Sequence, residues 1–324
     1  MEPIFPLLRI PKNVIIEVIK NFPLNQLFVF SLVSTKTKDL VTSLGLEASD
    51  VGICFWSGIR VIVYIGENHL VLDFYKDSND LNAAVDITLP VAAYVVYEGP
   101  RTQSTTPLFN FSDWLNHIQL VICCNQPPSI KFDRGCERLG IDSLKEIVGN
   151  VNKLVLMTSL TDDESRKVLK CFNAASELYV YKNPFEDIGQ IQQIFIQNFE
   201  IVEFFGFYSL EDMLTVNSEQ VDFCSSTTQK QFNQFIKHWI RGSNPRLQRM
   251  YLPIDKTDFV NGKIYLKGIK CMKMSEEEKR EIRRRHDLPS YADVIQIRRK
   301  DGTFAVIEIV ELNDILAINF IVLD

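Results

Sequence analysis

The N-terminal segment carries an unusually dense pattern of apolar side chains. Between Ile4 and Val33, 18 of 30 residues are large and apolar, against 46% hydrophobic residues in the whole chain. Pro11 suits the first turn of a helix, where its missing N–H is not needed. After it, apolar residues fall on one broad helical face: Val14, Ile15, Val18, Ile19 and Phe22. The pattern predicts a short helix that ends before Pro23.

Two more helices are predicted directly after the first one. Residues 24–32 are apolar nearly all round, and Ser34 can cap a third helix. The positions of that helix expected to face inward are Thr37, Leu40, Val41 and Leu44. Three short helices lie near the lower limit for a self-supporting domain, and each large apolar side chain left in water forfeits about 1.5–3 kcal/mol of burial. We therefore expect either the rest of the chain or another protein to cover the surplus.

A short strand pattern, in which two apolar residues flank any residue, recurs through the middle of the chain. Its first positions are Ile130, Leu154, Leu178, Val202, Val221 and Met250, at steps of 24, 24, 24, 19 and 29 residues. The intervening residues 141–148, 162–172 and 229–240 can form helices. Steps of this size are typical of leucine-rich repeats, in which each unit is a strand followed by a helix.

The predicted fold is therefore of the α+β or α/β class. Three N-terminal helices precede a mixed α/β domain with irregular leucine-rich-repeat-like strand–helix units, flanked by β-rich segments. The alternative is that these strands recur by coincidence in an ordinary mixed α/β domain.

One face of the predicted repeat sheet combines aromatic side chains with carboxylates. Alternation along each strand sends Ile, Leu and Val to one side and the intervening residues to the other. Rigid aromatic side chains on a sheet face suit protein recognition. The candidate target-binding residues are Val155, Tyr179, Tyr181, Glu203, Phe205, Asp222 and Tyr251. The alternative is that another layer of the same chain covers this face.

The segments on both sides of the repeats are predicted to be rich in strands. Before the repeats, we expect strands at 51–55, 60–65, 70–75 and 91–97 and a helix at 112–124. After them, we expect a strand at 264–266. Ser275 and Glu278 predict a capping box for a helix over 276–286. The dipeptide Asp301-Gly302 between two apolar runs predicts a β-hairpin.

The residues offer no recognisable catalytic, cofactor or metal site. A phosphate loop, a dinucleotide fingerprint, a nucleophile elbow and a zinc signature are all absent from the sequence. The four histidines, His69, His117, His238 and His286, are scattered and do not have metal-ligand spacing. We expect no enzymatic activity and no cofactor. The arginines of residues 280–285 are expected to pair with Glu276 and Glu281 at i, i+4 on a solvated helix, rather than to bind RNA or an acidic partner.

Composition and charge narrow the class of protein further. The 324 residues suffice for one large domain or two unequal ones, and the formal charge of −6 argues against a nucleic-acid partner. No apolar run approaches the roughly 20 residues of a membrane span, and no secretory signal is recognisable. The seven irregularly spaced cysteines predict reduced, mostly buried thiols. An intracellular protein, cytoplasmic and/or nuclear, without a membrane partner is expected.

The N-terminal segment resembles an F-box. The resemblance rests on residues 5–19, FPLLRIPKNVIIEVI, and on residues 30–38, FSLVSTKTK, which resemble the third-helix start of nematode F-box proteins. Two departures from the general pattern are Ile10 in place of Leu and Thr37 near a position where many F-boxes carry Trp. The resemblance implies binding to a Skp-type adaptor and, through it, to a cullin ubiquitin ligase. Carried over by position, the adaptor-binding residues are Ile10, Pro11, Val14, Ile15, Val18, Ile19, Phe22 and Leu27.

A second resemblance, to the F-box-associated type 2 domain of the same nematode family, lies farther along the chain. It rests on residues 207–219, FYSLEDMLTVNSE, and 232–247, FNQFIKHWIRGSNPRL. In the second string an apolar helical stripe containing Trp239 predicts core packing, and Gly242 can end the helix.

Together the two resemblances imply a division of the chain and a function. They imply an F-box at 1–46 and an associated region at 47–324, with a repeat-like core at about 128–252 and the type 2 motif at about 205–270. The implied function is that of a non-catalytic substrate receptor that recruits an unknown protein target to a Skp–cullin–F-box ubiquitin ligase. An interaction scaffold acting outside a ubiquitin ligase is the alternative.

Overall fold

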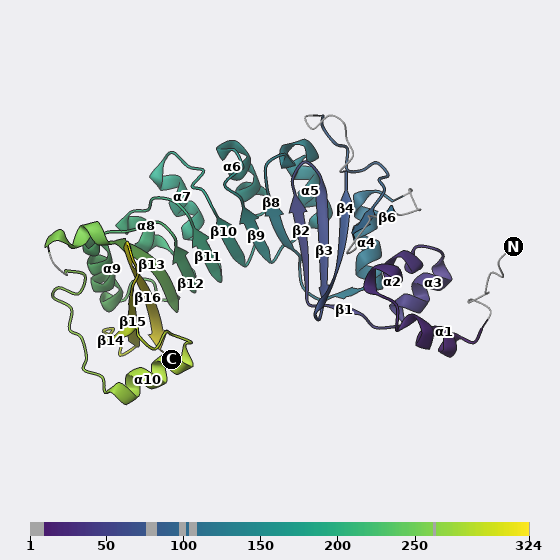
Figure 1. Cartoon of the computed structure of the whole chain (residues 1–324). Helices are drawn as coiled ribbons and strands as arrows, with labels where there is room; N and C mark the ends of the chain where they lie inside the picture. The colour runs from purple at the N-terminus through teal and green to yellow at the C-terminus, as the bar shows by residue number, and fades with distance from the viewer. Residues whose placement is uncertain (1–9, 76–82, 97–101, 104–108, 262–263, 324) are drawn as a thin grey trace. The chain divides into compact units, whose positions relative to one another are not determined.

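The structure is a computed structural model that describes residues 10–75, 83–96, 102–103, 109–261 and 264–323. The chain forms two compact units, residues 1–175 and 176–324, and each is described here by itself (Figure 1). The predicted domain boundary after residue 46 falls within the first unit and stays a prediction.

Three short helices open the first unit, as the apolar pattern predicts. They are α1 (Lys12–Ile19), α2 (Leu24–Ser31) and α3 (Thr35–Thr42). Pro11 and Pro23 stand at the N-caps of α1 and α2. Ser34 caps α3 in a reciprocal capping box with Thr37. Both α1 and α2 pack against α3, so the N-terminal three-helix prediction is confirmed.

The remainder of the first unit is a mixed α/β layer. Its strands are β1 (Glu47–Ala48), β2 (Asp50–Phe55), β3 (Ile59–Ile65), β4 (Asn68–Phe74), β5 (Tyr94–Val96), β6 (Thr102–Gln103), β7 (Cys123–Cys124), β8 (Ser129–Phe132) and β9 (Lys153–Leu156). Its helices are α4 (Phe111–Val121), the 3₁₀ turn η2 (Cys136–Leu139), α5 (Ile141–Val148) and α6 (Asp162–Cys171). Strands β2 to β6 form an antiparallel series, whereas β2, β8 and β9 pair in parallel.

Two expectations are wrong, one about this unit and one about the cysteines of the whole chain. The helix predicted over 112–124 ends at Val121, and Cys123–Cys124 instead form the strand β7 beside β1, because the N–H of Cys123 donates to the carbonyl of Leu46. The thiols are also not mostly buried. All seven cysteines lie in the described part of the chain and are free, but Cys136 alone is buried.

Helices α2 and α3 share a core with α4. The buried Phe28 ring of α2 lies 6.4 Å from the Trp114 ring and 5.7 Å from the His117 ring, both on α4. Ser31 Oγ is 2.8 Å from His117 Nε2, and burial lowers the pKa of that histidine to about 4. The chain itself therefore covers one side of the N-terminal helices.

The second unit alternates strands and helices before it ends in an antiparallel sheet. Its strands are β10 (Glu177–Val180), β11 (Ile201–Phe204), β12 (Gln220–Phe223), β13 (Arg249–Asp255), β14 (Asp293–Arg298), β15 (Phe304–Glu311) and β16 (Ile315–Leu323). Its helices are α7 (Ile188–Phe195), α8 (Leu210–Thr215), α9 (Gln229–Arg241), the 3₁₀ turn η3 (Lys256–Asn261) and α10 (Glu276–Arg285). Strands β10 to β13 run parallel, and β13, β16, β15 and β14 follow in antiparallel order (Figure 1).

The main core of this unit lies between the sheet and helices α7 and α9. Phe195 of α7 packs edge-on against Phe204 of β11 at 5.3 Å, and Trp239 of α9 packs against Phe320 of β16 at 4.9 Å. Trp239 is fully buried, and Gly242 ends α9 at a φ of 115°, so both predictions for this string are confirmed. Hereafter, the side of strands β10–β13 that faces away from helices α7 and α9 is called the open face.

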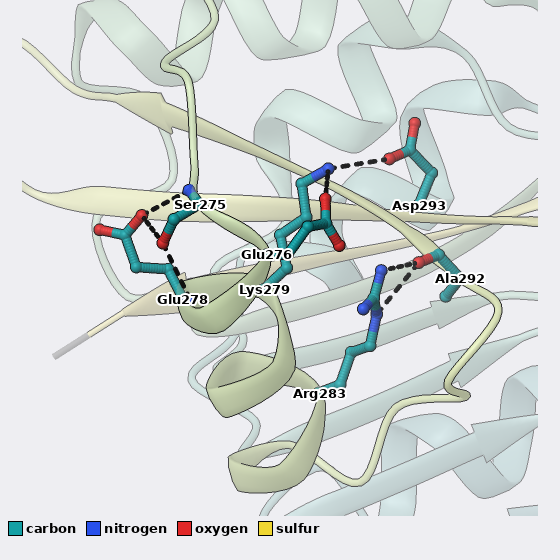
Figure 2. Close-up of polar contacts among 7 residues, drawn as sticks. All are labelled: Ser275, Glu276, Glu278, Lys279, Arg283, Ala292 and Asp293. Carbon is teal, nitrogen blue, oxygen red and sulfur yellow. Dashed lines mark hydrogen bonds and ion pairs between the residues drawn. The ribbon is translucent and has the colours of Figure 1, made fainter.

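Helix α10 lies on the same side of the sheet as the open face, over β14–β16. Its Ile282, together with Met274 and Leu288, packs on a buried cluster of Val294, Val306 and Ile321. Figure 2 shows the polar contacts that hold it. Ser275 and Glu278 form the predicted capping box at the start of α10.

The charged residues of α10 reach the neighbouring strand β14. Lys279 Nζ lies 3.2 Å from Glu276 and 3.9 Å from Asp293, and Arg283 donates to the Ala292 carbonyl at 2.8 and 3.2 Å (Figure 2).

Two further expectations fail in this region. Glu276 pairs with Lys279, and Glu281 with Arg284, at i, i+3 and not with the arginines expected at i+4. Residues 264–266 form a turn and not a strand. The Asn233 amide donates to the Tyr265 and Lys267 carbonyls, which occupies backbone groups that a sheet partner would need.

Candidate functional site

The outer stripe of α1 is the first candidate site. Val14 and Val18 stand one helical turn apart and are 43% and 40% exposed, whereas Ile15 and Ile19 are buried. An aliphatic pair on one stripe of a short helix is costly to leave in water. This stripe is apolar surface that the described part of the chain leaves uncovered.

A groove opens beside this stripe, between α1 and α3. It has a volume of about 330 Å³. Ile10, Ile15 and Leu40 supply its apolar lining, and Lys12, Lys36 and Asp39 supply charged groups. An apolar floor with a charged rim has the character of a protein-docking groove.

The eight predicted adaptor-binding residues divide into two groups. Pro11, Val14 and Val18 are exposed, and Ile10 and Phe22 are half-buried. Ile15, Ile19 and Leu27 are buried inside the unit, so they support the surface and do not present it. Val33, which is 69% exposed at the end of α2, belongs to the same apolar surplus. The sequence signal that could have identified Val33 as exposed is its position directly before the Ser34 cap.

The open face of the second unit is the second candidate site. Register places Tyr179, Glu203, Asp222 and Tyr251 in one row across four parallel strands, each a direct neighbour of the next. All four are half-buried, and neighbouring positions in such a row are about 4.8 Å apart.

A second row lies toward the carboxyl ends of the same strands. The rings of Tyr181 and Phe205 meet edge-on at 4.9 Å, and Cys224 comes directly after the next strand, β12. On the other side of the first row, the Tyr179 hydroxyl donates to Glu177 Oε2 at 3.0 Å. Glu177 and Cys224 were not predicted as site residues, although both stand two positions from predicted ones and alternation places them on the same face.

The carboxylates set the electrostatics of this face. Burial first, and then Glu177, Glu203 and Asp222, raise the pKa of the Tyr179 hydroxyl. Burial, Glu203 and Asp222 likewise raise the pKa of the Cys224 thiol to about 12. A thiol with that pKa is protonated at neutral pH and a poor nucleophile. The face therefore disfavours any added negative charge.

Val155, the remaining predicted target-binding residue, lies in the first unit. It is half-buried on β9, where it neighbours Lys131 of β8. Its row contains Lys131 and Cys54, so it does not share the acidic and aromatic character of the open face.

The segment from α10 to Ala292 partly bears out the alternative that another layer of the chain covers the sheet. Tyr251 packs against the buried cluster of Ala292, Val310 and Ala317. In the same row, Asn319 and Glu308 follow Tyr251. Glu308 is fully buried, whereas Tyr179, Glu203 and Asp222 keep access to solvent. The covered part of this side thus lies over β14–β16.

Glu308 leads to a prediction about pH dependence. Asn319 donates to its Oε2 at 2.6 Å, Oε1 has no hydrogen-bond partner among the described residues, and burial raises its pKa above 4.5 although Asn319 and Arg249 oppose the shift. The pKa of Glu308 is therefore higher in the folded chain than in the unfolded chain. The free energy of unfolding falls as the pH rises through the interval between these two pKa values. We expect Glu308→Gln to raise the free energy of unfolding by about 1 kcal/mol at about pH 8 and to change it little near pH 4.

Urea unfolding at both pH values measures this effect. Glu200→Gln, at an exposed position before β11, is the control and should leave the pH dependence unchanged. Equal effects of Glu308→Gln at both pH values would contradict the role given to the buried charge.

Among the residues that the structure describes, no three His, Cys, Asp or Glu side chains are grouped to hold a metal ion. No helix within the described ranges is both long and apolar enough to cross a bilayer.

Comparison with known proteins finds similarity in each of the two units. Residues 7–48 match the F-box domain family, and residues 190–252 match the family described as F-box associated. The chain is 26% identical over 251 residues to the F-box associated domain-containing protein sdz-33 of Caenorhabditis elegans, an alignment that covers 76% of this chain and 78% of that protein. No solved structure matches the chain.

Proposed function

We propose that this chain, an F-box protein of the nematode type with an F-box-associated domain, is a substrate receptor of a Skp–cullin–F-box ubiquitin ligase. Residues 1–46 would act as the adaptor-binding domain and residues 47–324 as the target-binding region. The receptor would work inside the cell, in the cytoplasm and/or nucleus.

The observation that carries the proposal is the uncovered stripe of α1. Val14 and Val18 remain exposed beside an apolar groove, while α4 seals the other side of the helices through Phe28. Only part of the apolar surplus is thus used internally, and the rest has the chemistry of a docking surface. The proposed occupant is the Skp-type adaptor.

The strand–helix succession supports the target-binding half of the proposal. Strands β8 to β11 begin at residues 129, 153, 177 and 201, and helices α5, α6 and α7 lie between them. We propose that these are irregular leucine-rich-repeat-like units, in which each strand contributes one residue to a row that faces a partner. The chain itself would contribute proximity, by holding the target at high effective concentration near the ligase, and no bond-making group.

A reconstitution tests the receptor function. The tagged full chain is co-expressed with a nematode Skp-type adaptor and its cullin, and the purified complex is sized by chromatography. A receptor forms a stoichiometric complex, whereas a scaffold that works outside a ubiquitin ligase elutes alone. Elution alone would overturn the proposal in favour of the scaffold.

A further inference from the structure

The open face of the second unit has a composition that selects the charge of its partner. Its rows bring together the carboxylates of Glu177, Glu203 and Asp222. The cationic residue of these rows is Arg249, which lies in the row of Glu177, next to the row that contains Asp222. Arg249 is exposed, whereas Asp222 is half-buried, and burial raises the pKa of the Asp222 carboxyl although Arg249 opposes the shift. The face therefore carries negative charge on partly dehydrated groups.

Aromatic side chains frame these carboxylates. Tyr179 and Tyr251 stand at the two ends of the Glu203–Asp222 pair in the same row. Phe205 is 38% exposed and packs edge-on against Tyr181. Aromatic rings attract cations over their faces, and carboxylates attract them by charge.

Anionic and neutral occupants fit this face less well. The same carboxylates that help keep Tyr179, Tyr181, Tyr251 and Cys224 protonated would repel a phosphate or an acidic segment. A purely aliphatic segment would strip water from Glu203 and Asp222 without replacing their hydrogen bonds, which is costly. A guanidinium or ammonium group supplies both hydrogen-bond donors and positive charge.

We propose that the open face binds a basic segment of the recruited protein and seats an arginine or lysine side chain between Tyr179, Glu203, Asp222 and Tyr251. The proposal rests on the receptor function and specifies the class of target that this face selects. The net charge of −6 on the whole chain favours encounter with such a partner.

The test uses the full chain and two defined probes. One is a fluorescein-labelled decapeptide of alternating arginine and glycine, and the other is the same peptide with glutamate in place of arginine. Fluorescence anisotropy is expected to show saturable binding of the arginine peptide, weakened by added salt, and no binding of the glutamate peptide.

Paired variants locate the binding. Glu203→Gln with Asp222→Asn removes the charges at constant shape and is expected to weaken arginine-peptide binding about tenfold or more. Glu200→Gln with Glu211→Gln is the matched control, because both of these glutamates are exposed outside the open face, before β11 and on α8. Phe205→Ala tests the aromatic frame and is expected to weaken binding about fivefold.

Three outcomes would overturn the proposal: equal binding of the two peptides, unchanged binding by the Glu203→Gln, Asp222→Asn variant, or equal loss in the control variant. Adaptor capture by the same preparations separates this proposal from the receptor function. If the adaptor is captured but the arginine peptide fails, the receptor function stands and the cationic preference falls. If wild-type chain fails to capture the adaptor, the receptor function falls whatever the peptides do.

Discussion

A chain that carries Val14→Glu and Val18→Lys is expected to stay folded and to lose capture of the Skp-type adaptor by about 100-fold or more. Both valines are exposed in the free chain, so substitution costs the fold little. Glu near the start of α1 and Lys near its end also suit the helix dipole. In the complex, however, two charged groups would have to lose water against an apolar partner. Co-purification and calorimetric titration with the adaptor measure the loss.

A second double variant controls for added charge. Ile196→Glu with Leu312→Lys introduces the same two charges at exposed apolar positions of the second unit, and it should capture the adaptor as the parent chain does. Ile19 is unsuitable for such a test because it is buried, and a charge there would unfold the helices. If the Val14→Glu, Val18→Lys chain keeps its helical circular dichroism and still binds the adaptor with parental affinity, α1 is not the docking surface.

Asn244→Ala is expected to cost the second unit about 3–4 kcal/mol of unfolding free energy. Asn244 is buried and adopts a φ of 49°, a left-handed conformation that Asn tolerates better than Ala. Its amide donates to the carbonyls of Met213, Leu214 and Val216 at 3.0, 3.4 and 2.9 Å. Alanine would leave carbonyls at the end of α8 without this donor while retaining the backbone strain.

Urea unfolding separates the two contributions to this loss. Asn244→Gly relieves the backbone strain but not the missing hydrogen bonds, so its loss should be smaller than that of Asn244→Ala by about 1 kcal/mol. Asn244→Asp keeps the side-chain shape and replaces the donor by an acceptor, so it should be as damaging as alanine. A loss below about 1 kcal/mol for Asn244→Ala would show that neither feature stabilises the unit.

Local signals predicted most of the secondary structure. Ser34 and Ser275 cap α3 and α10 as expected, and the Asp301-Gly302 hairpin forms with a φ of 104° at Gly302. These features depend on residues within a few positions of one another, where sequence spacing and spatial distance agree. The strand expected at 264–266 failed because Asn233, more than 30 residues earlier, takes the backbone carbonyls of that segment.

The candidate sites were only partly predictable for the same reason. The F-box resemblance supplied the eight adaptor-binding residues by position, but neither it nor helical periodicity could tell that Val14 and Val18 face water while Ile15 and Ile19 pack inward. Strand alternation placed Tyr179, Glu203, Asp222 and Tyr251 on one face, and the register aligned them in one row. Alternation did not indicate that α10 covers the adjoining strands and leaves this row accessible.

Apolar periodicity, capping residues and the Asp301-Gly302 turn by themselves determined the three N-terminal helices, the order of the strand–helix units and the β14–β15 hairpin, since each of these depends on contacts within one element or between adjacent ones. Only the tertiary structure decided which apolar side chains of the N-terminal helices stay exposed. It also decided that Phe28 and Ser31 contact α4 and that the Asn244 amide donates to carbonyls at the end of α8. These outcomes depend on side chains about 30 or more residues apart that compete for the same backbone groups and the same core volume. The hydrophobic pattern of a single element does not encode the result of that competition.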